Sequence, residues 1–275
     1  MKKTGIFLIP LLIFAVISLL GTKLFAAGAI SPAMLVLISA VAMVAMALIR
    51  PKAKTAAKFS PNVVQELLGD FSKDAFAEDP QNAAKFQSAV SDYIQSMPKA
   101  ALNKLEKLQS LCKTDADHYA VTVAMGMAKA ALSDFDGAIK LYNKAVVICP
   151  TSQLADAMGS LQQRVGELKK AIDSYEFALD LEPGNLQVRS KLATAHVADG
   201  DFDNAIEQAQ QVLDLDERNA SALATIAICH GVLGHDSLYQ GYTAKAVEAG
   251  YKAEKITSTV PILKKKFRKT LESMR

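Results

Sequence analysis

Histidine is the residue type here best suited to metal binding or proton transfer, and the chain has four. His196 and His230 stand 34 residues apart, the interval at which other features of the chain recur. Equivalent places in a repeat favour packing within a core over catalysis. His230 and His235 lack the helical spacing of a metal-ligand pair. We therefore predict no metal site.

The three cysteines, Cys112, Cys149 and Cys229, are far apart and form no CxxC pair, a pattern typical of buried free thiols in a reducing compartment. The sequence also contains no glycine-rich phosphate loop, no nucleophile elbow and no HExxH motif. We predict that the chain is not an enzyme, has no catalytic or cofactor-binding residues, and needs no cofactor.

Charge is distributed unevenly along the 275 residues, although the net charge is only +3. Residues 1–58 carry seven basic and no acidic side chains, and residues 252–275 carry eight basic and two acidic ones. The body between them, residues 59–251, has 16 basic against 26 acidic side chains, a net charge of −10. A nucleic-acid-binding body would need cations to neutralise phosphates, so we predict no nucleic-acid partner.

A repeat of about 34 residues runs through that body. The hexapeptide DFDGAI at residues 134–139 returns as DFDNAI at 201–206, with ELKKAI at 167–172 midway between them. A period of this length predicts one pair of helices per repeat. Gly166, Gly200 and Gly234 also recur at 34-residue steps, where a turn between paired helices needs a residue free to adopt positive φ.

These units resemble the tetratricopeptide-repeat family, which places small residues, one aromatic and a proline at fixed positions of a helix pair. One unit carries the set Met125, Gly126, Ala138, Tyr142, Ala145 and Pro150. The next carries Met158, Gly159, Ala171, Tyr175, Ala178 and Pro183. A third, with Leu192, Ala193, Ala205, Ala209, Val212 and Glu217, lacks the aromatic and the proline. The resemblance implies an α-solenoid whose repeats stabilise one another.

We predict an all-α protein in which a transmembrane helical hairpin precedes an α-solenoid of helix-turn-helix repeats. The predicted segments are a membrane anchor at 1–58, a juxtamembrane helical linker at 59–81, a solenoid at 82–251 and a basic capping helix at 252–275. The solenoid divides into a weakly patterned unit at 82–115 and further units at 119–151, 152–185, 186–218 and 219–251.

The resemblance implies that a protein or peptide partner binds along the concave face formed by the first helix of each pair. The predicted groove residues are Gln153, Asp156, Ser160, Gln163, Arg164, Gln187, Ser190, Lys191 and Thr194. Simple solvation of these side chains is the alternative. The family's carboxylate clamp needs a set of Lys, Asn and Arg, of which only Lys191 and Arg164 are present. In the preceding repeat the same face is apolar, with Ala120, Val123, Met127 and Ala130.

Apolar and basic residues alternate near the C-terminus. Leu263, Phe267 and Leu271 recur every four residues among lysines and arginines, which predicts a basic amphipathic helix. Its apolar stripe would cover the exposed edge of the last repeat. Residues 262–271 could in addition contact anionic lipid, where each nearby cation contributes ~1 kcal/mol.

Two apolar segments, at about 6–25 and 30–49, are long enough to cross a bilayer. The second is uncharged for twenty residues, and Lys23 lies near the end of the first. Lysines and arginines precede the first segment and follow the second, which predicts two spans in a bacterial inner membrane, with both ends cytoplasmic. Alternatively, residues 1–29 form a cleaved signal peptide, leaving one span and the same side for the body.

These features predict a membrane-tethered scaffold or adaptor that binds a partner through its solenoid groove. The alternative is a structural subunit of an envelope, secretion or cofactor-assembly membrane complex, in which the solenoid only braces the membrane partners.

Overall fold

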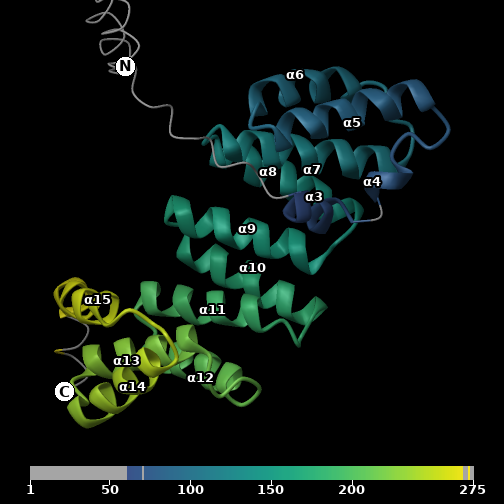
Figure 1. Cartoon of the computed structure of the whole chain (residues 1–275). Helices are drawn as coiled ribbons and strands as arrows, with labels where there is room; N and C mark the ends of the chain where they lie inside the picture. The colour runs from purple at the N-terminus through teal and green to yellow at the C-terminus, as the bar shows by residue number, and fades with distance from the viewer. Residues whose placement is uncertain (1–60, 70, 269–271, 273–275) are drawn as a thin grey trace, which may run out of the picture. The chain divides into compact units, whose positions relative to one another are not determined.

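The computed structural model describes residues 61–69, 71–268 and 272, and in this part the chain folds into α-helices joined by turns (Figure 1). The all-α prediction is confirmed there, because these residues include no β-strand. The predicted anchor at 1–58, with its spans at 6–25 and 30–49, lies outside the described residues. Among the helices of the described ranges, none is both long enough and apolar enough to cross a bilayer.

Most of the helices form consecutive pairs, and the second helix of each pair contacts the first helix of the next. This arrangement is an α-solenoid. The pairs are α5 (Pro80–Ile94) with α6 (Pro98–Gln109), α7 (Asp115–Ala131) with α8 (Phe135–Ile148), α9 (Ser152–Val165) with α10 (Leu168–Leu181), α11 (Leu186–Asp199) with α12 (Phe202–Leu213), and α13 (Ala220–Leu233) with α14 (Asp236–Glu248).

Local sequence signals set where the first helices begin and end. At each start a side chain accepts a hydrogen bond from the backbone N–H three residues later, which satisfies one of the donors left free at a helix N-terminus. The residues in this role stand 34 apart and are Thr151, Asn185 and Asn219. The same helices end at glycines with φ between 84° and 92°, as the sequence predicts, and these are Gly166, Gly200 and Gly234.

Each of the two best-patterned pairs is closed by contact between a glycine and a tyrosine. In the pair of α9 and α10, the Tyr175 ring lies against Gly159, so closely that a Cβ added to the glycine would stand 2.7 Å from Tyr175 Cε1. Gly126 and Tyr142 repeat this contact in the preceding pair. Ala171 and Ala178 on α10 are 0% exposed, because neighbouring helices approach too closely for a larger side chain.

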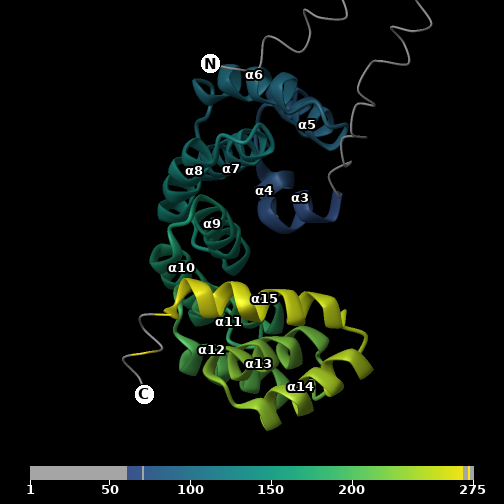
Figure 2. The same cartoon turned by 90° about the vertical axis from the view of Figure 1, so that its left-hand side faces the viewer.

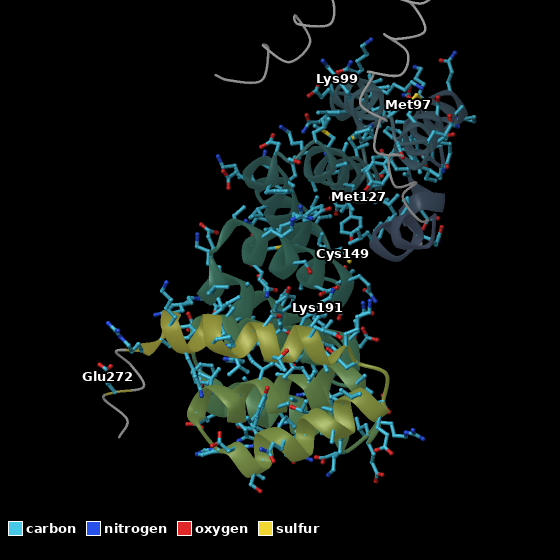
Figure 3. All side chains as sticks on the ribbon, turned by 60° about the vertical axis from the view of Figure 1, so that its left-hand side comes forward. Met97, Lys99, Met127, Cys149, Lys191 and Glu272 are labelled. Atoms are coloured by element: carbon cyan, nitrogen blue, oxygen red, sulfur yellow. The ribbon has the colours of Figure 1, made fainter. Side chains whose placement is uncertain are left out.

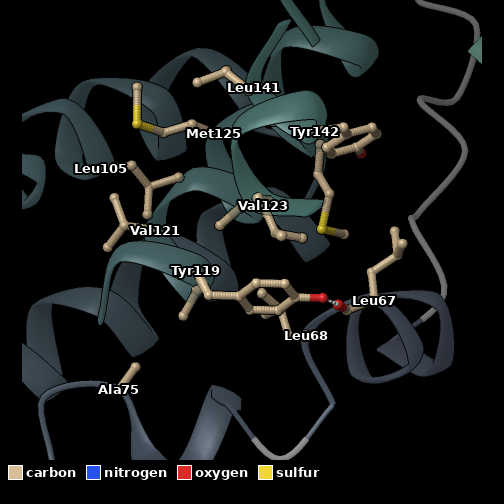
Figure 4. Close-up of a cluster of buried hydrophobic side chains, with 14 of the residues drawn as sticks. Leu67, Leu68, Ala75, Leu105, Tyr119, Val121, Val123, Met125, Leu141 and Tyr142 are labelled. Carbon is tan, nitrogen blue, oxygen red and sulfur yellow. Dashed lines mark hydrogen bonds between the residues drawn. The ribbon is translucent and has the colours of Figure 1, made fainter. Parts of the chain in front are cut away.

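The N-terminal helices α3 (Pro61–Leu68) and α4 (Phe71–Asp74) belong to the core of the solenoid unit. The sequence predicts a linker over residues 59–81, whereas Leu68 is only 1% exposed and Phe76 only 4% exposed. Tyr119 on α7 donates a hydrogen bond from its hydroxyl to the Leu67 carbonyl at 3.2 Å (Figure 4). The segment is therefore helical but is not a spacer, because its apolar face packs against α7.

The C-terminal helix α15 (Ala253–Lys266) packs mainly on α13 and extends past it to the preceding pair (Figure 2). Leu263 is 9% exposed, and the Phe267 ring meets the Phe202 ring edge-on with 5.6 Å between centroids. Lys266 Nζ donates to the Ala198 carbonyl at 2.6 Å. The predicted covering role is confirmed for Leu263 and Phe267, but the covered surface includes two repeats rather than the last one alone.

The glycine–tyrosine contact predicts a specific loss of stability. We expect Gly159→Ala to lower the free energy of unfolding by about 1 kcal/mol or more, because overpacking costs about 1–3 kcal/mol and outweighs the helix propensity gained by alanine. Urea unfolding followed by circular dichroism measures the change.

The matched control is Gly184→Ala, because a Cβ on Gly184 meets no atom within 4 Å. Equal unfolding midpoints for the two variants would contradict the proposed close contact.

Candidate functional site

Two adjoining hollows lie on the face formed by the first helices, between the parts of that face covered by α3 and by α15. The first has a volume of about 370 Å³ and the second about 490 Å³. Both include Gln187 and Lys191, so they form one continuous depression, which we call the inner groove. Lys191 marks its position between Cys149 and α15 in the view of Figure 3.

Seven of the nine predicted groove residues line the inner groove. They are Gln153, Asp156, Ser160, Gln187, Ser190, Lys191 and Thr194. The sequence analysis missed other lining residues, which come from α3, from the turns before α11 and α13, and from the next repeat. These are Leu67, Glu182, Asn185, Asn219 and Ser221. The 34-residue register from Gln153 through Gln187 could have indicated Ser221, but no local signal places α3 here.

An ion pair between adjacent repeats crosses the centre of the groove. Lys191 Nζ on α11 lies 2.7 Å from Asp156 Oδ1 and 2.6 Å from Asp156 Oδ2 on α9. The two side chains are 31% and 22% exposed, so solvent screens the pair only partly. Because each charge already has its partner, the middle of the groove offers no isolated charge to a ligand.

Two carboxamides in the groove have hydrogen-bonding capacity to spare. Gln153 and Gln187 occupy equivalent first-turn positions of α9 and α11 and are exposed. In the ranges that the structure describes, neither side chain has a hydrogen bond, ion pair or ring contact. A carboxamide carries both donors and an acceptor, as a peptide unit does, so the two positions could pair with successive stretches of an extended backbone.

Three hydroxyl groups along the groove already have hydrogen-bond partners. Ser190 Oγ donates to the Leu186 carbonyl at 2.8 Å, and Thr194 Oγ1 donates to the Ser190 carbonyl at 2.7 Å. The Tyr175 hydroxyl lies 3.3 Å from Ser160 Oγ and 3.1 Å from Gln163 Oε1, and it donates to the glutamine oxygen, which can only accept. Burial raises the pKa of Tyr175, so this hydroxyl stays protonated and remains a donor. The structure therefore gives Gln163 a supporting role beneath the groove.

Arg164 lies apart from the groove that the sequence predicts for it. Its guanidinium carbon stands 4.6 Å from the centroid of the Phe135 ring at the start of α8, a cation–π contact with the preceding repeat. Since Lys191 is bound to Asp156 as well, neither cation of a carboxylate clamp faces the groove unpaired. The structure provides no such clamp at these two positions.

Two of the histidines, His196 and His230, lie near the end of a first helix, and each is close to the residue that precedes the second helix of the same pair. His196 is 7% exposed, and its Nδ1 lies 3.6 Å from Asp201 Oδ2. One repeat later, His230 Nδ1 lies 3.2 Å from His235 Nδ1, so His230 is not the core residue that the sequence predicts. No three His, Cys, Asp or Glu side chains converge as a metal site within the described part of the chain.

The described cysteines are free thiols, but only Cys229 is fully buried. Burial raises the pKa of Cys229 to about 12, and burial together with Asp117 raises the pKa of Cys112 to about 11. Thiols with such high pKa values stay protonated near neutral pH and are poor nucleophiles.

A third hollow, of about 600 Å³, lies between α12 and α14 and was not expected from the sequence. Asp214, Glu217 and Glu248 line it together with Arg218 and Lys245. Its charges are mixed, and its lining residues come from α12, from the turn after it, from α13 and from α14, so no local pattern marks it.

A stack of helix pairs with a groove along its first helices defines the class of this protein, a helical-repeat protein. Residues 157–222 match the sequence model of the tetratricopeptide repeat family. This stretch of the chain therefore consists of tetratricopeptide repeats.

The match to known sequences is partial. The chain is 33% identical over 82 residues to the photosystem I assembly protein Ycf3 of Synechococcus elongatus, a match covering 29% of this chain and 47% of that protein. It is 24% identical over 133 residues to sperm-associated antigen 1 of Rattus norvegicus, covering 47% of this chain and 15% of the other. The chain thus spans about half the length of the cyanobacterial relative.

Solved structures share the fold. The crystal structure of MamA superposes with a TM-score of 0.54 at 19% identity, covering 58% of this chain and 93% of MamA. YrrB, described as a TPR protein with an unusual peptide-binding site, superposes with a TM-score of 0.55 at 16% identity, covering 66% of this chain and 93% of YrrB. Likeness at such low identity shows the fold alone.

The pairing of His230 with His235 predicts a response of stability to pH. Burial and the neighbouring His235 lower the pKa of His230 below its usual value. A histidine with a lowered pKa contributes stability that is present above its unfolded pKa of about 6.5 and is lost as pH falls below it. We therefore expect the urea midpoint of unfolding to decrease when the pH is lowered from 7.5 to 5.5.

His235→Asp copies the arrangement of His196 with Asp201. The new carboxylate should raise the pKa of His230 and shrink or reverse its loss of stability at low pH. NMR titration of the His230 ring measures the pKa directly, and an unchanged value in the variant would rule out this coupling.

Proposed function

We propose that this protein is an adaptor that binds an extended segment of a partner protein in the inner groove and acts by binding rather than by catalysis. The observation that carries the proposal is the pair of equivalent carboxamides, Gln153 and Gln187, which face the groove without partners of their own. If these two side chains met only solvent, nothing would require them to stand at equivalent positions of adjacent repeats.

The groove suits a polar segment with one apolar side chain. Leu67 and Ala157 line the first hollow together with the polar residues, and Ala157 is partly exposed. A side chain placed there would cover apolar surface while the peptide backbone pairs with the carboxamides. Lys191 and Asp156 neutralise each other and leave Glu182 as the remaining charge among the lining residues. Hydrogen bonds and shape would select the partner, and an acidic segment would be disfavoured.

The test is loss of partners when the two carboxamides are removed together. We expect Gln153→Ala with Gln187→Ala to lower the yield of the main crosslinked partner at least tenfold, because each lost hydrogen bond costs about 0.5–1.5 kcal/mol and any unpaired partner group costs more. Crosslinking in intact cells, affinity capture and quantitative mass spectrometry give the yield.

The matched control replaces two exposed glutamines on second helices, Gln109→Ala with Gln210→Ala. Equal yields from the two double variants would refute binding in the groove.

We also propose that residues 6–25 and 30–49 tether this adaptor to a bacterial inner membrane with both chain ends in the cytoplasm. Support comes from the two apolar segments, of which the second is uncharged and the first contains only Lys23, and from the cations that flank them. On α15, Lys264 and Lys265 are exposed and Ile262 is 66% exposed, a surface suited to contact with anionic lipid by residues 262–271.

Membrane fractionation tests the tether. Two retained spans should keep the full chain in the membrane pellet after an alkaline carbonate wash, at the mass of the unprocessed chain. A mass reduced by about residues 1–29 would favour the cleaved signal peptide, and release into the supernatant would refute tethering.

A photoactivatable anionic lipid should label α15 less in the Lys264→Ser, Lys265→Ser variant if the lipid contact exists.

The second candidate is a structural subunit in the assembly of a membrane complex. The partial match to a protein named for photosystem I assembly favours it. Blue-native electrophoresis separates the two candidates. A complex that persists when residues 1–58 are replaced by an unrelated anchor supports the adaptor, and one that needs the original segment supports the subunit.

A further inference from the structure

The helix α3 lies in an apolar depression on the first-helix face of α7, which we call the seat. The seat is formed by Tyr119, Val123, Ala124 and Met127, which are at most 6% exposed in the presence of α3. Three side chains of α3 fill it, namely Val64, Leu67 and Leu68. The sequence analysis assigned this face of the solenoid to ligand binding, so α3 occupies the place where a partner's apolar side chains would lie.

The seat does not depend on α3 for its own structure. The helix α7 already packs against α6 on one side and α8 on the other, as each first helix in the stack does. The capping box of α7, in which Thr114 and Asp117 bond to each other's backbone, fixes its start, and Asp117 Oδ1 also accepts a hydrogen bond from the Phe76 N–H at 2.6 Å. Displacement of α3 alone would leave these contacts of α7 in place.

The helix α3 depends on the seat, however. It has eight residues, whereas an isolated helix shorter than about 12–15 residues is marginal in water. Its end at Gly69 has φ of +53° with open space where a Cβ would lie. Val64 and Leu68 are only 5% and 1% exposed, so the apolar face of α3 is buried against its neighbours. The short helix therefore owes its stability to the seat rather than to its own hydrogen bonds.

The pattern of α3 is that of a helical ligand. Val64, Leu67 and Leu68 follow the i, i+3, i+4 spacing of an amphipathic helix that binds in a groove. Leu67 also lines the first hollow of the inner groove, so the seat and the groove adjoin. A segment bound in both would have a short apolar helix next to an extended polar stretch.

We propose that the seat is a second binding site, for an amphipathic helix of a partner with the apolar pattern of α3, and that this helix binds by displacing α3. The resident helix then acts as a competitor that keeps the seat covered until such a partner is present. The proposal rests on the solenoid being a binding protein but not on the inner groove being used.

Hydrogen exchange on the unmodified full chain in mild detergent is the first measurement. Displacement requires that α3 leave the seat while α7 stays folded, so we expect backbone amides of residues 65–68 to exchange at least a hundredfold faster than those of residues 121–127. Equal rates in the two helices would overturn the proposal.

The second measurement uses a fluorescent peptide with the sequence of residues 61–76 as the probe. We expect it to bind the full-length Leu68→Asp chain at least tenfold more tightly than wild type, because aspartate weakens the resident helix and opens the seat. Adding Met127→Asp on the seat should abolish the gain. Equal affinity for wild type and Leu68→Asp would overturn the proposal. If the Leu68→Asp variant does not fold, the hydrogen-exchange measurement decides the question.

The groove variant separates this inference from the proposed function. Gln153→Ala with Gln187→Ala, placed in the Leu68→Asp chain, should bind the peptide with unchanged affinity. If cellular partners are lost with the groove variant but the peptide still binds, the two sites are distinct. If the peptide is lost too, it binds in the groove, and the seat is not its site.

Discussion

Close approach of neighbouring helices is the constraint on which this structure depends. Alanines at equivalent places, such as Ala171 and Ala205, are 0% exposed because no larger side chain would fit between the helices. One tyrosine per well-patterned pair fills the remaining space against a glycine. A helix pair alone cannot bury its apolar face, so the repeats depend on one another, and the ends of the stack need covers.

Two segments of the chain cover parts of the first-helix face, and they determine which part of that face is left for a partner. The segment with α3 and α4 covers α7, and α15 covers α13 and reaches Phe202. Between them the polar residues of α9 and α11 remain open. The polarity of this stretch follows from its position, because apolar side chains there would have no helix to cover them.

Much of the fold can be predicted because it depends on local, periodic signals. The glycines at positive φ, the capping residues and the small-residue positions recur at 34-residue steps and act within one or two turns. Seven groove residues follow from the same register. The rest depends on long-range contacts that no period encodes: α3 packs against Tyr119, some 50 residues later, and Arg164 reaches back to Phe135. The approach of His230 to His235 depends on the turn at Gly234, which breaks helical spacing.

The pairing of Lys191 with Asp156 favours a groove that recognises its partner by shape and by hydrogen bonds. An unpaired lysine would attract any carboxylate, whereas a lysine whose charge is balanced by both oxygens of an aspartate gains less from a second carboxylate. The Lys191 charge is already balanced by Asp156, and Glu182 also lines the groove, so a bound acidic group would gain little. An uncharged backbone meeting Gln153 and Gln187 displaces only water, so the groove favours an extended neutral segment over the charged tail that a carboxylate clamp would hold.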